Sequence, residues 1–456
     1  LIVGIVVVAI IALLATNKKF VETLKNIYKI EELRKRILYT LGLLLVYRLG
    51  CFVVIPGINP NALGEGSALA SQLDGNGLLG LLNVFSGGAF GNAAIFALGV
   101  MPYITASIII QLLTIAIPAL ERLQKEGGEE GRKKLASITR YTAVGIGLIM
   151  GFAYYMLIKN GVNGQSMLTA DGAGVWPAIV IIMTFMAGSA LIMWMGEQVT
   201  EFGVGNGISI ILFASIIAHF PSSIGTMITN VSNGSLAWWA LALVIVGALA
   251  IVVLIVIVND AERRIPVQYS KRVVGRKLYG GQSTHLPMKV NMSGVMPIIF
   301  AQSIASIPAT ICAFVPSWQN SWLMVNVFNT NTVPYAIIYF LLIIAFSYFY
   351  ATIQFDPVEI ANNLKKNGGF IPGFRAGKPT SEYIRKVLNK ITLMGALYLS
   401  IVAVVPILIG CFTTATSLSG ISLGGTSIII VVGVALETVR AVEAQMLMRN
   451  YKGFLD

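Results

Sequence analysis

The sequence predicts an all-α polytopic membrane protein with ten transmembrane helices, arranged as two inverted five-helix halves around a central pore. The first observation is composition: of 456 residues, 56% are hydrophobic and only 11% are charged. Soluble domains carry about 25% charged residues, so a water-soluble fold is excluded. The second is a series of long apolar runs with basic residues between them. The third is a short motif that occurs twice, five runs apart.

The apolar runs define the predicted spans, because a helix needs about 20 apolar residues to cross the hydrocarbon core of a bilayer. The ten runs lie at 37–54, 92–118, 139–158, 176–195, 207–222, 236–258, 293–315, 334–354, 391–411 and 425–445. An uncharged apolar run at 1–16 precedes them, and at about 1.5 Å per residue it reaches only about 24 Å. We interpret 1–16 as an extra segment of uncertain origin rather than a signal peptide, because it has no basic leader.

Basic residues predict the orientation, since cytoplasmic loops are enriched in Lys and Arg. Of the 32 Lys and Arg residues, 30 fall in segments that lie on one side if ten spans are correct. These segments are 17–36, 119–140, 259–290, 355–390 and the part of the chain from Arg440 onward. Both termini are therefore predicted to be cytoplasmic, with 17–36 as an amphipathic basic segment.

A repeated motif predicts the internal symmetry. The segments 99–106 and 294–301 agree at six of eight positions, and each places a proline inside a predicted span. An odd number of spans between equivalent elements reverses their direction, which gives an inverted repeat. The halves are then 37–222 and 236–456, joined by a hinge loop at 223–235. Each proline is expected to weaken its helix locally.

Ionisable residues are nearly absent from the centres of the spans. Arg48 is the exception, and we expect it to reach the outer interface by snorkelling. Glu437 and Arg440, near the cytoplasmic end of the last span, are expected to pair on one helix face. Ion-coupled transporters usually keep charges at mid-membrane, so this pattern disfavours transport of that kind. With two His and three Cys, the chain also offers no Cys/His cluster for a metal site.

Three features suggest a gated pore. The stretch 77–88 is apolar but too short to cross, so it is either a re-entrant movable stopper or a static interfacial helix. Polar side chains flank the repeated motif on both predicted helices and would hold two helices together only weakly. Val100 with Ile104, and Met296 with Ile299, share helix faces. Such a stripe is either packing core or a hydrophobic constriction that gates by excluding water.

Four motifs resemble the SecY family, the channel subunits of bacterial protein translocases. They are FALGVMPYITASIIIQLL at 96–113, NVFSGG at 83–88, QSTHLPMKVN at 282–291, and ANNLKK with FIPG at 361–373. The resemblance implies an hourglass pore between the two halves, a plug near 77–90, and a lateral gate between the second and seventh spans where signal sequences intercalate. It also implies location in the bacterial inner membrane.

The resemblance assigns roles by position. The pore ring would contain Val100, Ile104, Ile216, Met296, Ile299 and Leu399, with Leu212 as a possible seventh member. The plug would contain Leu81, Leu82, Asn83, Val84, Phe85 and Ser86. The lateral gate would contain Thr105, Ser107, Gln111, Gln302 and Ser303. Partner docking would use Arg263, Arg264 and Arg375, in the two cytoplasmic loops 259–290 and 355–390.

The function expected from these residues is a passive protein-conducting channel that translocates unfolded preproteins and inserts membrane proteins laterally. No Gly-Lys-Ser/Thr phosphate loop is present, so energy would come from the motor ATPase SecA or from the ribosome. The implied partners are SecE, SecG, SecA, the ribosome, signal peptides and membrane lipids, and no cofactor is expected. The alternatives are a secondary transporter with inverted repeats and, less favoured, an intramembrane enzyme.

Overall fold

The structure of the chain is a computed structural model that is almost entirely helical. It describes residues 30–59, 78–125, 127–161, 167–169, 174–234, 238–269, 272–274, 277–279, 283–292, 294–314, 322, 326–328, 332–412 and 419–452. The predicted segment 1–16 and most of the basic segment 17–36 lie outside these residues.

A helix covers most of each of the ten predicted apolar runs. These helices are α3 (Glu31–Gly50), α6 (Met101–Ala116), α8 (Gly128–Asn160), α9 (Val175–Phe202), α10 (Gly207–Ser232), α11 (Trp238–Asp260), α12 (Met296–Phe314), α15 (Val333–Gln354), α17 (Lys378–Phe412) and α18 (Ser419–Lys452). Three shorter helices are α5 (Leu78–Phe85), α7 (Pro118–Lys125) and α16 (Pro357–Lys366).

Within the described part of the chain, five helices are long and apolar enough to cross a membrane, and a sixth span results if α6 and α7 are counted together. The α6–α7 pair is bent by 105° at its break, next to Pro118. Shorter apolar helices lie at Ile245–Asp260 and Met296–Ala305. The chain is therefore a polytopic membrane protein, while the number ten and the inverted halves stay predictions.

Two predicted boundaries differ from the structure. The second span begins at Met101 rather than at 92, because the chain from 86 to 100 runs through turns that include Gly99 at φ +55°. The predicted hinge loop at 223–235 is mostly helical, since α10 continues through Pro221 to Ser232. A proline removes one helix hydrogen bond, and a membrane helix can continue past that loss.

The two copies of the repeated motif have the same backbone geometry. Gly99 and Gly294 both have positive φ, +55° and +61°, and a helix begins two residues after each. Pro102 and Pro297 then lie at the second helical position rather than inside a helix. The predicted weakening is therefore wrong, because the N–H that proline lacks has no helical partner in the first turn.

The two long basic loops meet in one sheet, with strand order β4-β1-β5. Strand β1 (Glu262–Tyr269) pairs antiparallel with β4 (Ser283–Lys289) from the same loop and with β5 (Gly369–Phe370) from the other. Strands β2 (Arg272–Val274) and β3 (Lys277–Tyr279) form a separate pair at the tip. A buried apolar cluster fixes the sheet to the start of α17, and its members are Ile265, Val267, Met288, Ile371, Ile384 and Leu388.

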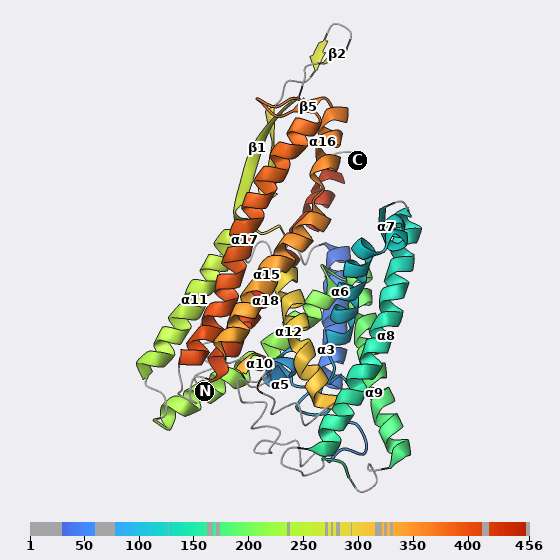
Figure 1. The fold of residues 1–456 in the computed structure, drawn as a ribbon, viewed down its shortest axis with the longest axis vertical. Coiled ribbons are helices and arrows are strands. Elements are labelled where there is room, and N and C mark those ends of the chain that lie inside the picture. Colours follow the sequence, from blue (N-terminus) through green and yellow to red (C-terminus); the bar gives the residue numbers. More distant parts are fainter. Residues whose placement is uncertain are drawn as a thin grey trace.

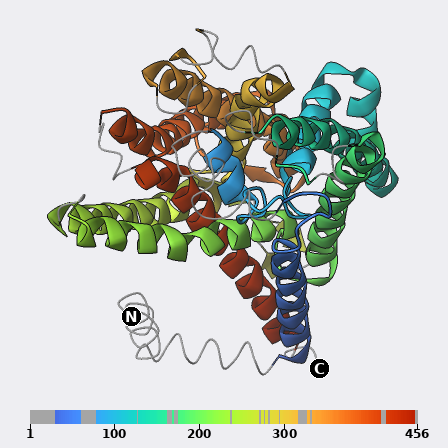
Figure 2. The same cartoon turned by 90° about the horizontal axis from the view of Figure 1, so that it is seen from below.

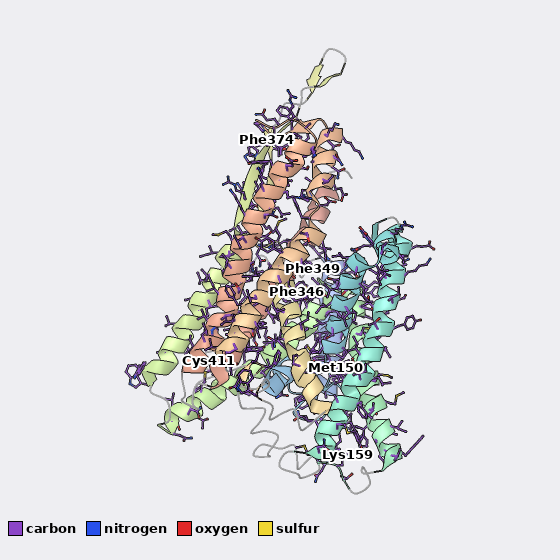
Figure 3. The ribbon with its side chains drawn as sticks, viewed as in Figure 1. Met150, Lys159, Phe346, Phe349, Phe374 and Cys411 are labelled. Atoms are coloured by element: carbon purple, nitrogen blue, oxygen red, sulfur yellow. The ribbon has the colours of Figure 1, made fainter. Side chains whose placement is uncertain are left out.

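The sheet and α16 lie at the upper end of the molecule in Figure 1, and α7 lies lower, at the upper end of the group formed by α6, α8 and α9. Phe374, in the loop before α17, lies at the end with the sheet, and Lys159 lies at the opposite end (Figure 3). These elements belong to three of the segments predicted to be cytoplasmic, 119–140, 259–290 and 355–390, and Lys159 belongs to a segment predicted on the other side. The orientation in the membrane stays a prediction.

The polar contacts of Arg440 differ from the prediction. Its guanidinium forms an ion pair with Asp260, at the end of α11, and donates to the Asn259 carbonyl at 2.9 Å. Asn259 Oδ1 in turn accepts from Asn291 Nδ2 at 2.8 Å. The expected partner Glu437 has its Oε1 2.7 Å from the position that a Cβ on Gly294 would take. A tertiary contact between α11 and α18 therefore takes the place of the expected pair within α18.

Candidate pore and gate

The six predicted ring residues lie in a single apolar cluster at the centre of the molecule. Val100 directly precedes α6, and the others come from α6, α10, α12 and α17. Val100, Ile104, Ile216, Ile299 and Leu399 are buried, Met296 is partly buried against them, and Leu212 belongs to the same cluster. Four separate helices thus contribute β-branched or long apolar side chains to one site. Their role as a pore ring remains a prediction.

The short helix α5 lies beside this cluster. Phe85, its last residue, is buried in the cluster, and Leu82 and Val84 pack against it. The helix also contacts α10. Seen from below, α5 lies near the centre with longer helices around it (Figure 2). Leu81 also lies in α5, but its side chain is outside the part that the structure describes. The last two predicted plug residues are Asn83, in α5, and Ser86, directly after it.

The turn after α5 is closed by hydrogen bonds from its own side chains. Asn83 Oδ1 accepts from the Gly91 amide at 2.8 Å. Ser86 Oγ donates to the Asn83 carbonyl at 3.0 Å and accepts from the Phe90 amide at 3.0 Å. Asn and Ser commonly satisfy local backbone groups in this way where a helix ends. The turn is therefore a defined structure rather than an irregular loop.

Two side chains in the last turn of α3 donate hydrogen bonds to the backbone of the turn that follows α5. The Tyr47 hydroxyl donates to the Ser86 carbonyl at 3.2 Å and lies 2.7 Å from Ser215 Oγ on α10. Arg48 Nη1 donates to the Gly87 carbonyl at 2.6 Å. At least one donor of the Arg48 guanidinium is therefore paired with a backbone carbonyl inside the protein, and its predicted reach to the outer interface stays a prediction.

The sequence did not identify Tyr47 or Ser215 as site residues. Tyr47 is buried, and its ring stacks on Phe96 with centroids 5.7 Å apart. The only local sign was a tyrosine beside Arg48 in an otherwise apolar run. Its partners lie 39 and 168 residues away, a separation that no local pattern reveals.

The predicted lateral gate lies where α6 and α12 contact each other. Thr105 Oγ1 donates to the Met101 carbonyl at 3.0 Å, and Gln111 Nε2 donates to Ser107 Oγ at 3.2 Å, both within α6. On α12, Ser303 Oγ donates to the Ile299 carbonyl at 2.9 Å. These hydrogen bonds run along each helix and do not join the two.

Gln302 and Ser303 are nevertheless buried, and Gln111 Oε1 is buried with no hydrogen-bond partner. The gate residues therefore include polar groups that are buried on α6 and on α12. A buried acceptor without a partner favours any arrangement that brings a donor to it.

The predicted docking arginines lie at the end of the molecule that carries the sheet. Arg263 and Arg264 are exposed on β1, and Arg264 forms an ion pair with Glu262 at 2.7 Å. Arg375 is exposed in the loop before α17, where its carbonyl accepts from Thr380 Oγ1 at 2.8 Å. Because β5 pairs with β1, strands from two loops about 100 positions apart belong to one sheet.

Fold and site together define a multi-pass helical membrane protein with a central apolar cluster and a short helix packed on it. The family model for SecY matches residues 94–439. The chain belongs to the SecY family. It is 46% identical over 441 residues to the protein translocase subunit SecY of Streptomyces coelicolor, covering 94% of this chain and 98% of that protein. The corresponding subunit of Mycobacterium tuberculosis is 42% identical over 446 residues, covering 96% and 99%.

Solved structures of protein-conducting channels share the fold. One describes a protein-conducting channel and aligns with a TM-score of 0.58 at 16% identity, covering 90% of this chain and 92% of that one. A second, on the SecY plug domain and the closed state that it stabilises, gives 0.60 at 16% identity with the same coverage. Sec61 in a canine ribosome-channel complex gives 0.55 at 15% identity, again covering 90% and 92%.

Proposed function

We propose that this chain is the central subunit of a protein-conducting channel in the bacterial inner membrane, and not an enzyme. It moves unfolded secretory proteins across the membrane and inserts membrane proteins laterally. One observation carries the proposal: the six predicted ring residues and the end of the predicted plug lie in the same buried cluster. Membership of the SecY family supports it, since the curated relatives are named as translocase subunits.

The proposed seal is hydrophobic. Val100, Ile104, Ile216, Met296, Ile299 and Leu399 carry no hydrogen-bonding side-chain group, so a narrow constriction between them excludes water and ions. Phe85 in α5 belongs to the same buried cluster and adds a further apolar side chain to the seal. An unfolded polypeptide can displace such a seal, because apolar side chains fit around a segment without specific partners. The seal can therefore open for a polypeptide without recognising a particular amino-acid sequence in it.

The proposed lateral exit is the contact between α6 and α12. The hydrogen bonds of Thr105 and Gln111 stay within α6, so these two bonds can persist when α6 and α12 part. Interhelical polar contacts in membranes are worth only about 0.6 kcal/mol on average. A signal sequence that inserts between the helices can therefore replace the contact at low cost.

The proposed docking surface is the sheet with the loop before α17. Arg263, Arg264 and Arg375 are exposed there, and arginines bind acidic protein surfaces or phosphate backbones without reading sequence. SecA and the ribosome are the proposed energy sources, with SecE and SecG as small subunits and lipids around the bundle. The canine Sec61 and yeast Ssh1 structures are of ribosome-bound complexes, which favours a ribosome partner.

The test is protection of a signal-bearing preprotein from protease in proteoliposomes. They contain this chain with its small subunits, SecA and ATP. We expect protected preprotein that disappears when ATP is omitted or when the signal sequence is removed. A preprotein that stays fully accessible, with the complex intact and ribosome-dependent insertion also absent, would contradict the proposal. Uptake of small solutes coupled to protons would instead favour the transporter.

A further inference from the structure

Arg48 lies in an apolar helix, where losing its hydrogen bond to the Gly87 carbonyl would be costly. It lies in the last turn of α3, where its Nη1 donates to the Gly87 carbonyl at 2.6 Å and its guanidinium carbon lies 4.8 Å from the centroid of the Phe52 ring. An arginine that is half-buried among apolar groups loses hydration, so its donors need partners within the protein. The Gly87 carbonyl is such a partner.

The backbone of the plug turn presents two consecutive carbonyls to α3. Gly87 has φ +67°, a conformation that glycine adopts without steric strain. The Ser86 carbonyl accepts from the Tyr47 hydroxyl at 3.2 Å and from Cys51 Sγ at 3.7 Å. One helical turn of α3 therefore donates to both carbonyls, and Arg48 makes the short, charge-assisted contact among them.

The anchored turn lies between α5 and the predicted ring. Phe85, one residue before the turn, is in the central cluster. A Cβ on Gly99 would lie 3.4 Å from Ser86 Cα, so the turn touches the chain directly before Val100. A shift of Ser86 and Gly87 would therefore displace α5 from the ring.

We propose that Arg48 is the positioning residue of the plug: its hydrogen bond to the Gly87 carbonyl holds α5 against the ring in the idle channel. The proposal rests on the proposed function, in which α5 contributes to the seal. Tyr47 assists through the Ser86 carbonyl. Opening the channel then requires the plug turn to leave α3, which gives the idle channel a threshold that a substrate has to overcome.

The test compares substitutions of Arg48 in proteoliposomes without substrate. Arg48→Met keeps a long side chain but has no donor, whereas Arg48→Lys retains a cationic donor. We expect the ion leak of the idle channel to rise about tenfold in Arg48→Met, which corresponds to about 1.4 kcal/mol in the opening equilibrium. Arg48→Lys should restore most of the seal. Arg36→Met removes the same charge from an exposed position on α3 and should leave the leak unchanged.

Cys51 provides a second readout that needs no transport. It is buried and donates to the Ser86 carbonyl. In a chain whose other two cysteines, Cys312 and Cys411, are replaced by Ser, we expect a water-soluble maleimide to modify Cys51 faster in Arg48→Met than in the parent or in Arg48→Lys. If Arg48→Met does not fold, Tyr47→Phe serves instead, because it removes only the hydroxyl that donates to Ser86.

Unchanged leak and unchanged Cys51 labelling in a folded Arg48→Met would overturn the proposal. A leak that Arg48→Lys fails to reduce would also overturn it, since the donor would then not be the cause. Failure of the proposed function is seen separately, as absence of preprotein protection with the unsubstituted chain. In that event the labelling of Cys51 still decides whether Arg48 holds the turn.

Discussion

At the scale of single residues, the proposed seal depends on side chains that cannot bind water. Ile104→Asn and Ile299→Asn each place an amide in the central cluster, where both isoleucines are buried. An unpaired buried amide costs about 1–3 kcal/mol, so the ring should admit water to satisfy it. We expect preproteins with defective signal sequences to be translocated more efficiently, measured as the fraction of protease-protected substrate. Ile104→Leu is the matched control, and an unchanged signal requirement in both Asn variants would remove these positions from the ring.

Close packing of helix α9 gives a prediction of stability. A Cβ on Gly188 would overlap the Ile95 carbonyl oxygen, a backbone atom that cannot rotate away. Gly188→Ala should therefore destabilise the protein by about 1–3 kcal/mol through overpacking. The measurement is thermal unfolding in detergent. Gly145→Ala, on α8 with nothing within 4 Å, is the control and should be neutral or slightly stabilising. Equal unfolding temperatures for the two variants would contradict the close approach.

The residue scale also shows what the sequence could not predict. The ring positions were assigned from the resemblance to the SecY family, and only some of them also share an apolar helix face in the sequence. The partners of Arg48 were not identified, because a side chain in an apolar run reveals its charge but not which carbonyl folds back onto it. The Ser86–Gly87 turn lies 39 residues from Tyr47 and Arg48 in the sequence, so tertiary packing alone brings it to α3.

At the scale of elements, the apolar runs located the helices well and their ends poorly. Hydropathy marks residues that avoid water, whether they are helical or in a buried turn. Residues 92–100 are apolar and mostly buried, yet the helix begins at Met101, after a turn in which Gly99 has positive φ. Similarly, a hinge loop was predicted at 223–235, but α10 continues to Ser232 because its other backbone hydrogen bonds remain available.

The contact between α6 and α12 gives a prediction for the lateral gate. In a chain without its three native cysteines, Thr105→Cys combined with Ser303→Cys should form a disulfide under mild oxidant, because the two helices lie side by side. The bond should block translocation and reductant should restore it, measured by protease protection. The control combines Ser303→Cys with Leu191→Cys on the exposed face of α9. If no disulfide forms when Thr105→Cys is combined with Ser303→Cys, these two positions do not face each other across the lateral gate.

At the scale of the whole molecule, the two basic loops pair in one sheet. The sequence predicted docking residues in each loop, and it contained no sign of their pairing. Strand β5 is only two residues long, and it pairs with Gln268 and Tyr269 of β1 across about 100 residues. Pairing at such separation is decided by the packing of α16 and α17 beneath the sheet, which no local pattern records.

The proposed docking surface leads to a prediction for reversing the charge of Arg375. Arg375 is exposed, and only its carbonyl takes part in the local hydrogen bond from Thr380, so Arg375→Glu should leave the fold intact. It should reduce SecA-driven, ATP-dependent protection of a preprotein at least tenfold, because a carboxylate would face an acidic partner surface; the loss corresponds to about 1.4 kcal/mol. Lys378→Glu makes the same change of charge at an exposed position three residues away and should have a smaller effect. Equal losses in both variants would mean that the partner responds to net charge alone. Full activity of Arg375→Glu would remove this arginine from the docking surface.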